Sequence, residues 1–191
     1  MVISAPSGAG KTTICRRLLE RHHNIRMSIS VTTRPRCKGE RNGRDYFFMT
    51  QEEFETKIRS GWFVEYAKVY GHYYGTPAKQ VERLLARKMI ILFDIDVQGG
   101  RSIKKVYPDA ITVFILPPSL SELKRRLASR HRDTETEMNK RLALALKEIK
   151  MRTKYDYTVI NSKLDQAVFR VESILEAESL KTRRIKVKNF G

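Results

Sequence analysis

Short apolar runs alternate with amphipathic stretches along the chain. The clearest runs are Lys88–Phe93 and Ala110–Leu116, which are too short to span a membrane and suit buried strands. Further strands are predicted at Met1–Ser4, Met27–Val31, Trp62–Val69 and Tyr157–Ile160. Strands that alternate with helices usually pair in parallel. The pattern therefore predicts an α/β fold with a parallel sheet core flanked by helices.

Helices are predicted between these strands. Thr12–His23 has an apolar face, and Thr76 before Pro77 marks another helix start. Two capping boxes mark the starts of further helices. Thr50 with Glu53 opens a helix that runs to about Ser60, and Ser119 with Glu122 opens another. Apolar stripes predict two more helices, at Met138, Leu142, Ala145 and Ile149, and at Val168, Val171, Ile174 and Leu175.

Two polar stretches interrupt this alternation. Thr32–Phe48 is rich in Gly, Arg and Asp, and Arg130–Thr136 separates two predicted helices. Such insertions lie on the surface and often carry function. The end of the chain, Lys181–Gly191, holds five cations and no acid, so we expect an exposed and frayed tail.

The net charge narrows the possible partners. The 191 residues are 41% hydrophobic and 31% charged, which is typical of a globular protein, but the net charge is +17. Such a chain attracts polyanions: nucleic acid, anionic membrane or phosphorylated small molecules. Composition alone does not choose among these.

The cysteine content and the first residues indicate a cytoplasmic protein. Cys15 and Cys37 are too few for a disulfide framework or a cysteine-built zinc site, which favours a reducing compartment. Residues Met1–Gly10 have neither the basic nor the apolar region of a secretory signal.

A phosphate-binding loop is predicted where the first strand meets the first helix. Gly10, Lys11 and Thr12 have the spacing of a P-loop, with Ala5 at the place of its first glycine. The alternative is a glycine-rich turn that happens to precede a helix. In a P-loop, Lys11 reaches the β- and γ-phosphates, and the Thr12 hydroxyl binds Mg²⁺. The ATP-binding residues predicted here are Ala5, Pro6, Ser7, Gly8, Ala9, Gly10, Lys11, Thr12 and Thr13.

Two aspartates follow the apolar run that ends at Phe93. The carboxyl end of a buried parallel strand is where such sheets bind ligands. Asp94 is interpreted as a residue that positions Mg²⁺, and Asp96 is assigned to the substrate or to the metal. The alternative for either residue is capping of a helix that begins near Gln98.

Several further motifs resemble the guanylate kinase family. They are the P-loop, Thr32–Arg36, the Gly39-Glu40 to Asp45-Tyr46 segment, Tyr73–Thr76, Asp94–Gly99 and Asn139–Leu142. They occur in the family's order and spacing, and the resemblance runs from Met1 to about Lys181. It implies a P-loop NTPase fold in one domain, with a core at about 1–31, 77–120 and 150–180. It also implies an inserted GMP-binding lobe at about 32–76, a helical lid at about 121–149 and a basic tail at 181–191.

The resemblance implies ATP-dependent phosphorylation of GMP, and of dGMP, to the diphosphate. Glu65 matches the family's guanine-binding carboxylate, which accepts from both N1–H and the 2-amino group. The full set of matched GMP-binding residues is Ser30, Arg34, Arg36, Tyr46, Glu65, Tyr74, Thr76 and Asp96. Tyr73 is better explained by packing than Tyr74. Many relatives have a second phosphate-binding arginine where this chain has Cys37, so its role falls to the neighbouring Arg36 or Lys38.

The same resemblance implies the residues of phosphoryl transfer. Cations must offset the charge that spreads over the transferring group, and no general base is needed. The matched catalytic residues are Lys11, Arg34, Arg126, Arg130 and Arg141. Mg²⁺, bound by Thr12 and Asp94, is the implied cofactor. Asn161 matches a position near the ATP adenine, and the alternative is that it caps the last helix.

Two other function classes compete with the enzyme. A scaffold protein with this fold usually has a degraded P-loop, whereas Gly10, Lys11 and Thr12 are intact. A nucleic-acid binder would explain the charge, but no recognisable nucleic-acid motif is present. We therefore expect ATP and GMP as partners, with no specific nucleic acid and no membrane. The sequence carries no signal for the oligomeric state.

Overall fold

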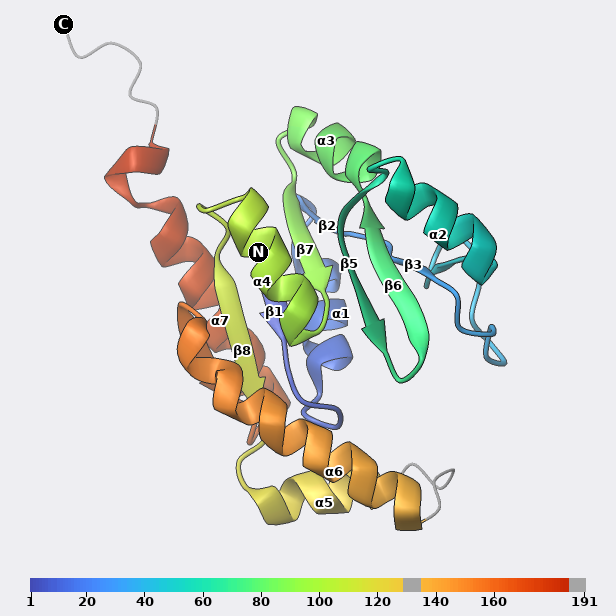
Figure 1. The fold of residues 1–191 in the computed structure, drawn as a ribbon. Helices are drawn as coiled ribbons and strands as arrows, with labels where there is room; N and C mark the ends of the chain where they lie inside the picture. The colour runs from blue at the N-terminus through green and yellow to red at the C-terminus, as the bar shows by residue number, and fades with distance from the viewer. Residues whose placement is uncertain (129–134, 186–191) are drawn as a thin grey trace, which may run out of the picture. The chain divides into compact units, whose positions relative to one another are not determined.

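The structure is a computed structural model that describes residues 1–128 and 135–185, with residues 135–137 described by their backbone alone. Contacts between Cα atoms divide the chain into two compact units. The first comprises residues 1–4 and 19–112, and the second comprises residues 5–18 and those from 113 onward. Figure 1 labels the elements of both units, which are described separately below.

The first unit contains three parallel strands, and the apolar strand β7 (Ile90–Asp94) is the middle one. β7 pairs with β1 (Val2–Ser4) on one side and with β2 (Ile25–Met27) on the other. Two helices, α3 (Ala78–Ala86) and α4 (Val97–Val106), pack against these strands. Their shared core is buried and aliphatic or aromatic, and consists of Val2, Val81, Ile91, Phe93, Ile95 and Ile103.

A second sheet in the same unit has the order β4-β3-β6-β5. Its longest pair is an antiparallel hairpin of β5 (Phe63–Val69) and β6 (His72–Pro77), visible as two long arrows in Figure 1. The short strands β3 (Val31–Thr32) and β4 (Phe47–Phe48) complete it. The helix α2 (Gln51–Arg59) begins with the predicted capping box at Thr50.

An aromatic layer lies between this sheet and α2. The ring of Phe54 stacks on Phe63 at 4.3 Å and on Tyr73 at 5.1 Å between centroids. Phe54 is fully buried. This confirms the interpretation of Tyr73 as a packing residue.

The structure corrects two predicted elements. Met27–Val31 is not one strand: the amide of Ile29 donates to the side chain of Gln80, after which the chain leaves β7 and joins the other sheet. The helix predicted after Thr76 does form, as α3, but the proline is not its first helical residue; Thr76 itself lies in β6 and its hydroxyl donates to Glu65. Pro77 takes the N-cap position of α3 and provides no side-chain cap.

The second unit is built on the parallel pair β8 (Thr112–Leu116) and β9 (Tyr157–Ile160). It also contains the start of α1 (Lys11–Arg21), which buries Ile14 and Leu18. The helices α5 (Leu120–Ala128) and α6 (Glu135–Lys150) pack side by side (Figure 1). Leu123, Leu127 and Ala145 form their buried core, with Leu142 and Ile149 against it, as the apolar stripe predicted.

The last helix is tied to the residues that follow it. The 3-10 turn η1 (Met151–Lys154) leads to β9, α7 spans Leu164–Ser179, and the 3-10 turn η2 spans Thr182–Arg184. Buried Glu178 accepts from Tyr157 and Lys181, each at 2.5 Å, and pairs with Arg184 at 3.3 Å. Residues 181–185 are exposed, as predicted, but the prediction that they are frayed is wrong, while 186–191 lie outside the described residues.

No helix among the described residues is long and apolar enough to cross a membrane.

Candidate functional site

The predicted phosphate loop is a tight turn between β1 and α1. Gly8 and Gly10 have φ of +87° and +93°, which favour glycine. The non-glycine residues with positive φ in the described chain are Tyr70 and Lys88, so Ala5 does not need the left-handed conformation. The backbone at position 5 therefore tolerates alanine where the motif usually has glycine.

Two side chains of the second unit hold this loop through the carbonyl of Ala9. The amide nitrogen of Asn161 donates to it at 2.8 Å, and Arg126 donates at 3.4 Å. Asn161 is buried, and a Cβ on Gly10 would lie 2.4 Å from its amide nitrogen. Asn161 does not cap α7, whose N-cap is Lys163. This excludes the capping alternative and places Asn161 against the phosphate loop.

Arg126 is held from three directions. It donates to the carboxylate of Glu122 at 2.7 Å and to the carbonyl of Asn161 at 3.2 Å, besides its bond to Ala9. Hydrogen bonds from Arg125 and Arg126 lower the pKa of Glu122 to about 2, so that carboxylate is ionised. The guanidinium of Arg126 is thus fixed beside the phosphate loop.

The other residues predicted on the ATP side lie on α1 and α6. Lys11 and Thr13 are half-buried in the first turns of α1, and Thr12 is exposed there. Arg141 is half-buried on α6. Arg130 lies outside the described residues.

Glu65 is a buried titratable group of the first unit with a strongly shifted pKa. Its side chain on β5 is buried, and one carboxylate oxygen accepts from the Thr76 hydroxyl at 2.6 Å. The other oxygen faces α4, because a Cβ on Gly99 would lie only 2.6 Å from it. Burial raises the pKa of Glu65 to about 7; Thr76 opposes the shift and the charge of Asp96 adds to it. The site therefore contains a carboxylate whose ionised form is disfavoured by burial.

Asp96 is the N-cap of α4. Its Oδ1 accepts from the amide of Gly99 at 2.9 Å, which confirms the capping alternative for this residue. Its Oδ2 accepts a longer hydrogen bond, at 3.4 Å, from the side-chain amide of Gln98. Asp94 ends β7 without capping α4. Ser30 is buried on the link between β2 and β3.

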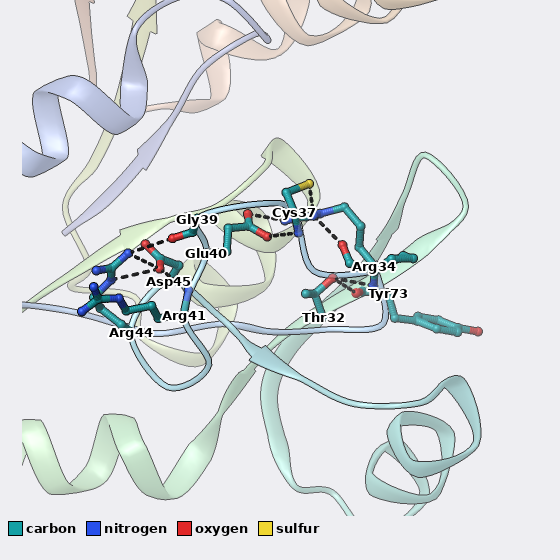
Figure 2. A network of polar contacts seen from close by, with 10 residues as sticks. Thr32, Arg34, Cys37, Gly39, Glu40, Arg41, Arg44, Asp45 and Tyr73 are labelled. Atoms are coloured by element: carbon teal, nitrogen blue, oxygen red, sulfur yellow. Dashed lines mark hydrogen bonds and ion pairs between the residues drawn. The ribbon is translucent and has the colours of Figure 1, made fainter. Parts of the chain in front are cut away.

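Arg34 is held in the loop that follows β3. Its guanidinium donates to Glu40 at 2.6 Å and to the sulfur of Cys37 at 2.9 Å (Figure 2). Glu40 also accepts from the amide of Cys37 at 2.7 Å. Burial opposes ionisation of Glu40, but hydrogen bonds from Arg34 and Cys37 hold its pKa below the ordinary value. A single carboxylate thus orients the arginine and closes the loop.

The predicted phosphate-binding residues of this unit come together around Arg34. Its guanidinium lies 5.5 Å from the ring centroid of Tyr46, and the rings of Tyr46 and Tyr74 are 6.0 Å apart. Hydrogen bonding to Glu40 raises the pKa of Arg34, with a smaller contribution from Tyr74. Arg36 and Lys38 are exposed on the same loop.

A second carboxylate stabilises the far end of this loop. Asp45 accepts from the amide of Arg41 at 2.7 Å and from the guanidinium of Arg44 at 2.8 Å (Figure 2). The hydrogen bond from the Arg41 amide, followed by that from Arg44, lowers the pKa of Asp45. The insertion that sequence analysis placed on the surface is therefore an ordered loop.

Three contributors to these sites were not predicted. Glu40 was noted as part of a family motif but no role was predicted for it, and Glu122 was interpreted only as a capping residue. The spacing of Glu122 and Arg126, typical of an ion pair on one helix face, was a signal that could have identified the pair. The close approach of Gly99 to Glu65 had no such signal, because it joins residues distant in sequence.

The oxygen donors expected for Mg²⁺ are the Thr12 hydroxyl and the Asp94 carboxylate. Such hard oxygen donors suit Mg²⁺, which takes one or two protein ligands and completes its shell with water and substrate phosphate. Within residues 1–128 and 135–185, no group of three or more His, Cys, Asp or Glu side chains could hold a metal ion. Each of the two donors, taken by itself, is of a type that Mg²⁺ binds.

Comparisons with known proteins agree on one family. The family model described as guanylate kinase matches residues 1–178. The chain is 47% identical to a guanylate kinase of Myxococcus xanthus, covering 100% of this chain and 92% of that protein. It is 46% identical to a guanylate kinase of Clostridium tetani, covering 97% and 89%. The crystal structure of guanylate kinase from Anaplasma phagocytophilum superposes with a TM-score of 0.81 at 36% identity, covering 96% of this chain and 87% of that one.

Proposed function

This chain belongs to the guanylate kinase family, a class of enzyme that phosphorylates GMP to GDP with ATP, and we propose how its residues divide that work. The P-loop NTPase fold and the enzyme class are those of the family. The proposal assigns GMP to residues of the first unit and ATP to residues of the second. The observation that carries it is the buried Glu65, whose ionised form is disfavoured by burial.

Glu65 recognises the guanine base. Guanine presents N1–H and a 2-amino group side by side, and an ionised carboxylate accepts from both. Thr76 orients one oxygen of Glu65, and Ser30 and Asp96 complete the base site. Adenine presents a ring acceptor there instead of N1–H, which would leave the buried carboxylate unpaired. Such an unpaired group gives strong discrimination between substrates.

The phosphate of GMP binds at Arg34, Tyr46 and Tyr74. An arginine fork and two hydroxyls hold the acceptor phosphate by charge-assisted hydrogen bonds. The ion pair with Glu40 supports this role, because it fixes the fork before GMP arrives. Arg36 contributes a further cation from the same loop and takes the place of the arginine found in many relatives.

ATP binds at the phosphate loop of residues 5–13, with Asn161 behind it. Backbone amides of the loop and the start of α1 face the phosphates, and Lys11 reaches the β- and γ-phosphates. Thr12 and Asp94 would hold Mg²⁺. The metal ion would supply charge neutralisation for the phosphate oxygens.

In the transfer, a phosphate oxygen of GMP attacks the γ-phosphorus of ATP, the bond to the β-phosphate oxygen breaks, and ADP leaves. The attacking oxygen is already anionic, so no residue needs to remove a proton. Arg126, Arg130 and Arg141 stabilise the charge on the transferred group. Glu122 supports this role by fixing Arg126 beside Ala9.

The GMP-binding lobe, the lid, a second substrate and the cellular location are also part of the proposal. GMP binds to the lobe at about 32–76, and the helices at about 121–149 form the lid. The base contacts do not involve the 2′-hydroxyl, so dGMP is a second substrate. The proposed location is the cytosol, where the free thiols of Cys15 and Cys37 stay reduced.

A coupled assay across nucleoside monophosphates tests this function. With MgATP, kcat/KM for GMP should exceed that for AMP by about 10⁴-fold. IMP, which lacks the 2-amino group, should fall between them. Glu65→Gln should lose most of the activity with GMP, whereas Glu82→Gln, an exposed carboxylate on α3, should not. Comparable use of AMP and GMP would refute the role assigned to Glu65.

A further inference from the structure

A cavity of about 510 Å³ lies in the first unit, and none of the residues proposed for GMP lines it. Its walls come from β4, from the region where α2 is followed by β5, and from α3. We call it the α2–α3 pocket and define it by six of its lining residues: Phe47, Phe48, Lys57, Trp62, Lys79 and Arg83. Its volume lies within the range of small-molecule sites, which is roughly 300–1,000 Å³.

The pocket combines aromatic surface with positive charge. Phe47, Phe48 and Trp62 are half-buried, so each ring retains surface that no other side chain covers. Lys57 places its ammonium 4.3 Å from the centroid of the Trp62 ring, and Lys79 is exposed on α3. Arg83, on the same helix, is the third cation, and no carboxylate lines the pocket. An aromatic ring that carries an anionic group matches both properties.

The pocket is separate from the guanine site, although the two adjoin. None of its lining residues belongs to the set proposed for GMP. Pro77 lines the pocket and directly follows Thr76, which orients Glu65. The ring of Phe48 lies 6.0 Å from that of Tyr46, which belongs to the residues proposed for the GMP phosphate.

We propose that the α2–α3 pocket is a second ligand site, which binds a planar aromatic ring bearing a phosphate group, up to the size of a nucleoside monophosphate. The ring lies against Phe47, Phe48 and Trp62, and the phosphate pairs with Lys79 and Arg83. This site goes beyond GMP phosphorylation and needs none of the residues of that reaction.

The single tryptophan of the chain makes a direct test possible, because Trp62 lines the pocket. In a ¹H–¹⁵N spectrum its indole N–H gives one peak that reports on this site. We expect 1-naphthyl phosphate to shift this peak in a saturable titration, even with GMP present at a saturating concentration. Neither 1-naphthol nor inorganic phosphate alone should bind comparably, because each lacks one of the two matched groups.

Two variants distinguish binding in the pocket from nonspecific attraction to the positive charge of the protein. The double variant Lys79→Gln with Arg83→Gln should weaken binding of 1-naphthyl phosphate by about tenfold or more. Arg87→Gln, which removes an exposed cation at the end of the same helix outside the pocket, should leave binding unchanged. The proposal is overturned if the indole peak does not shift, if GMP displaces the probe, if 1-naphthol binds equally well, or if the double variant binds as tightly as the parent.

Discussion

The raised pKa of Glu65 makes the stability of the ligand-free protein depend on pH in a way that one substitution removes. Burial shifts the pKa from 4.5 to about 7. Between these values the folded protein keeps a proton that the unfolded chain has released, so its free energy of unfolding falls as the pH rises. At about 1.36 kcal/mol per pH unit, the shift amounts to about 3 kcal/mol across this window. The destabilisation is absent below the unfolded pKa and complete above pH 7.

Glu65→Gln is the perturbation that isolates this effect. Glutamine has nearly the same shape and can still accept from the Thr76 hydroxyl, but it does not ionise. The variant should therefore gain about 2.5 kcal/mol relative to the parent between pH 5 and pH 8. Most other groups titrate alike in both proteins, so the difference between the two isolates position 65.

Urea unfolding of both proteins at pH 5, 6, 7 and 8, without nucleotide, measures this difference. Glu82→Gln serves as the matched control, because it removes an exposed carboxylate from the same unit. Its difference from the parent should stay flat across the range. A flat difference for Glu65→Gln as well would show that burial does not destabilise the ionised carboxylate, and would refute the reasoning.

Three further predictions concern the loops and the base site. Gly10→Ala should destabilise the protein by about 1–3 kcal/mol more than Gly39→Ala and weaken ATP binding. Both glycines have φ near +90°, but only at Gly10 would a Cβ lie 2.4 Å from the side-chain amide nitrogen of Asn161. Equal losses of unfolding free energy in the two variants, measured by chemical unfolding, would contradict this. Glu40→Gln should raise KM for GMP about tenfold with little change in kcat, because Arg34 loses the partner that orients it; an unchanged KM in steady-state kinetics argues against that role. Guanosine, which has no titrating phosphate, should bind about tenfold more weakly for each pH unit below about 7, since its donors need ionised Glu65; calorimetric titrations that give a constant Kd would contradict this.

Local patterns predicted those parts of the molecule that depend on neighbouring residues. The turn at Gly8 and Gly10 follows from the need for positive φ, and the capping box at Thr50 forms as its spacing indicates. The pair of Leu142 and Ile149 packs on α5 as its helical period requires. Each of these features depends on residues a few positions apart, so the sequence alone was sufficient.

Residues with two competing partners were not predictable in this way. Thr76 directly precedes the proline before α3, but it belongs to β6 and its hydroxyl bonds to Glu65 on the neighbouring strand. Residues 27–31 look like one strand, but the side chain of Gln80 takes the amide of Ile29 and the chain changes sheets. The choice in each case depends on a group brought near only by folding.

The sequence by itself therefore determined the family of this protein, its α/β order and the phosphate loop, because these are properties of residue type and short spacing. Only the tertiary structure decided that Glu65 is buried and accepts from Thr76, that Glu40 orients Arg34, and that Asn161 bonds to Ala9, 152 positions earlier in the chain. Burial and long-range pairing set the charge and direction of these groups. A side chain acquires both only when the chain around it has folded.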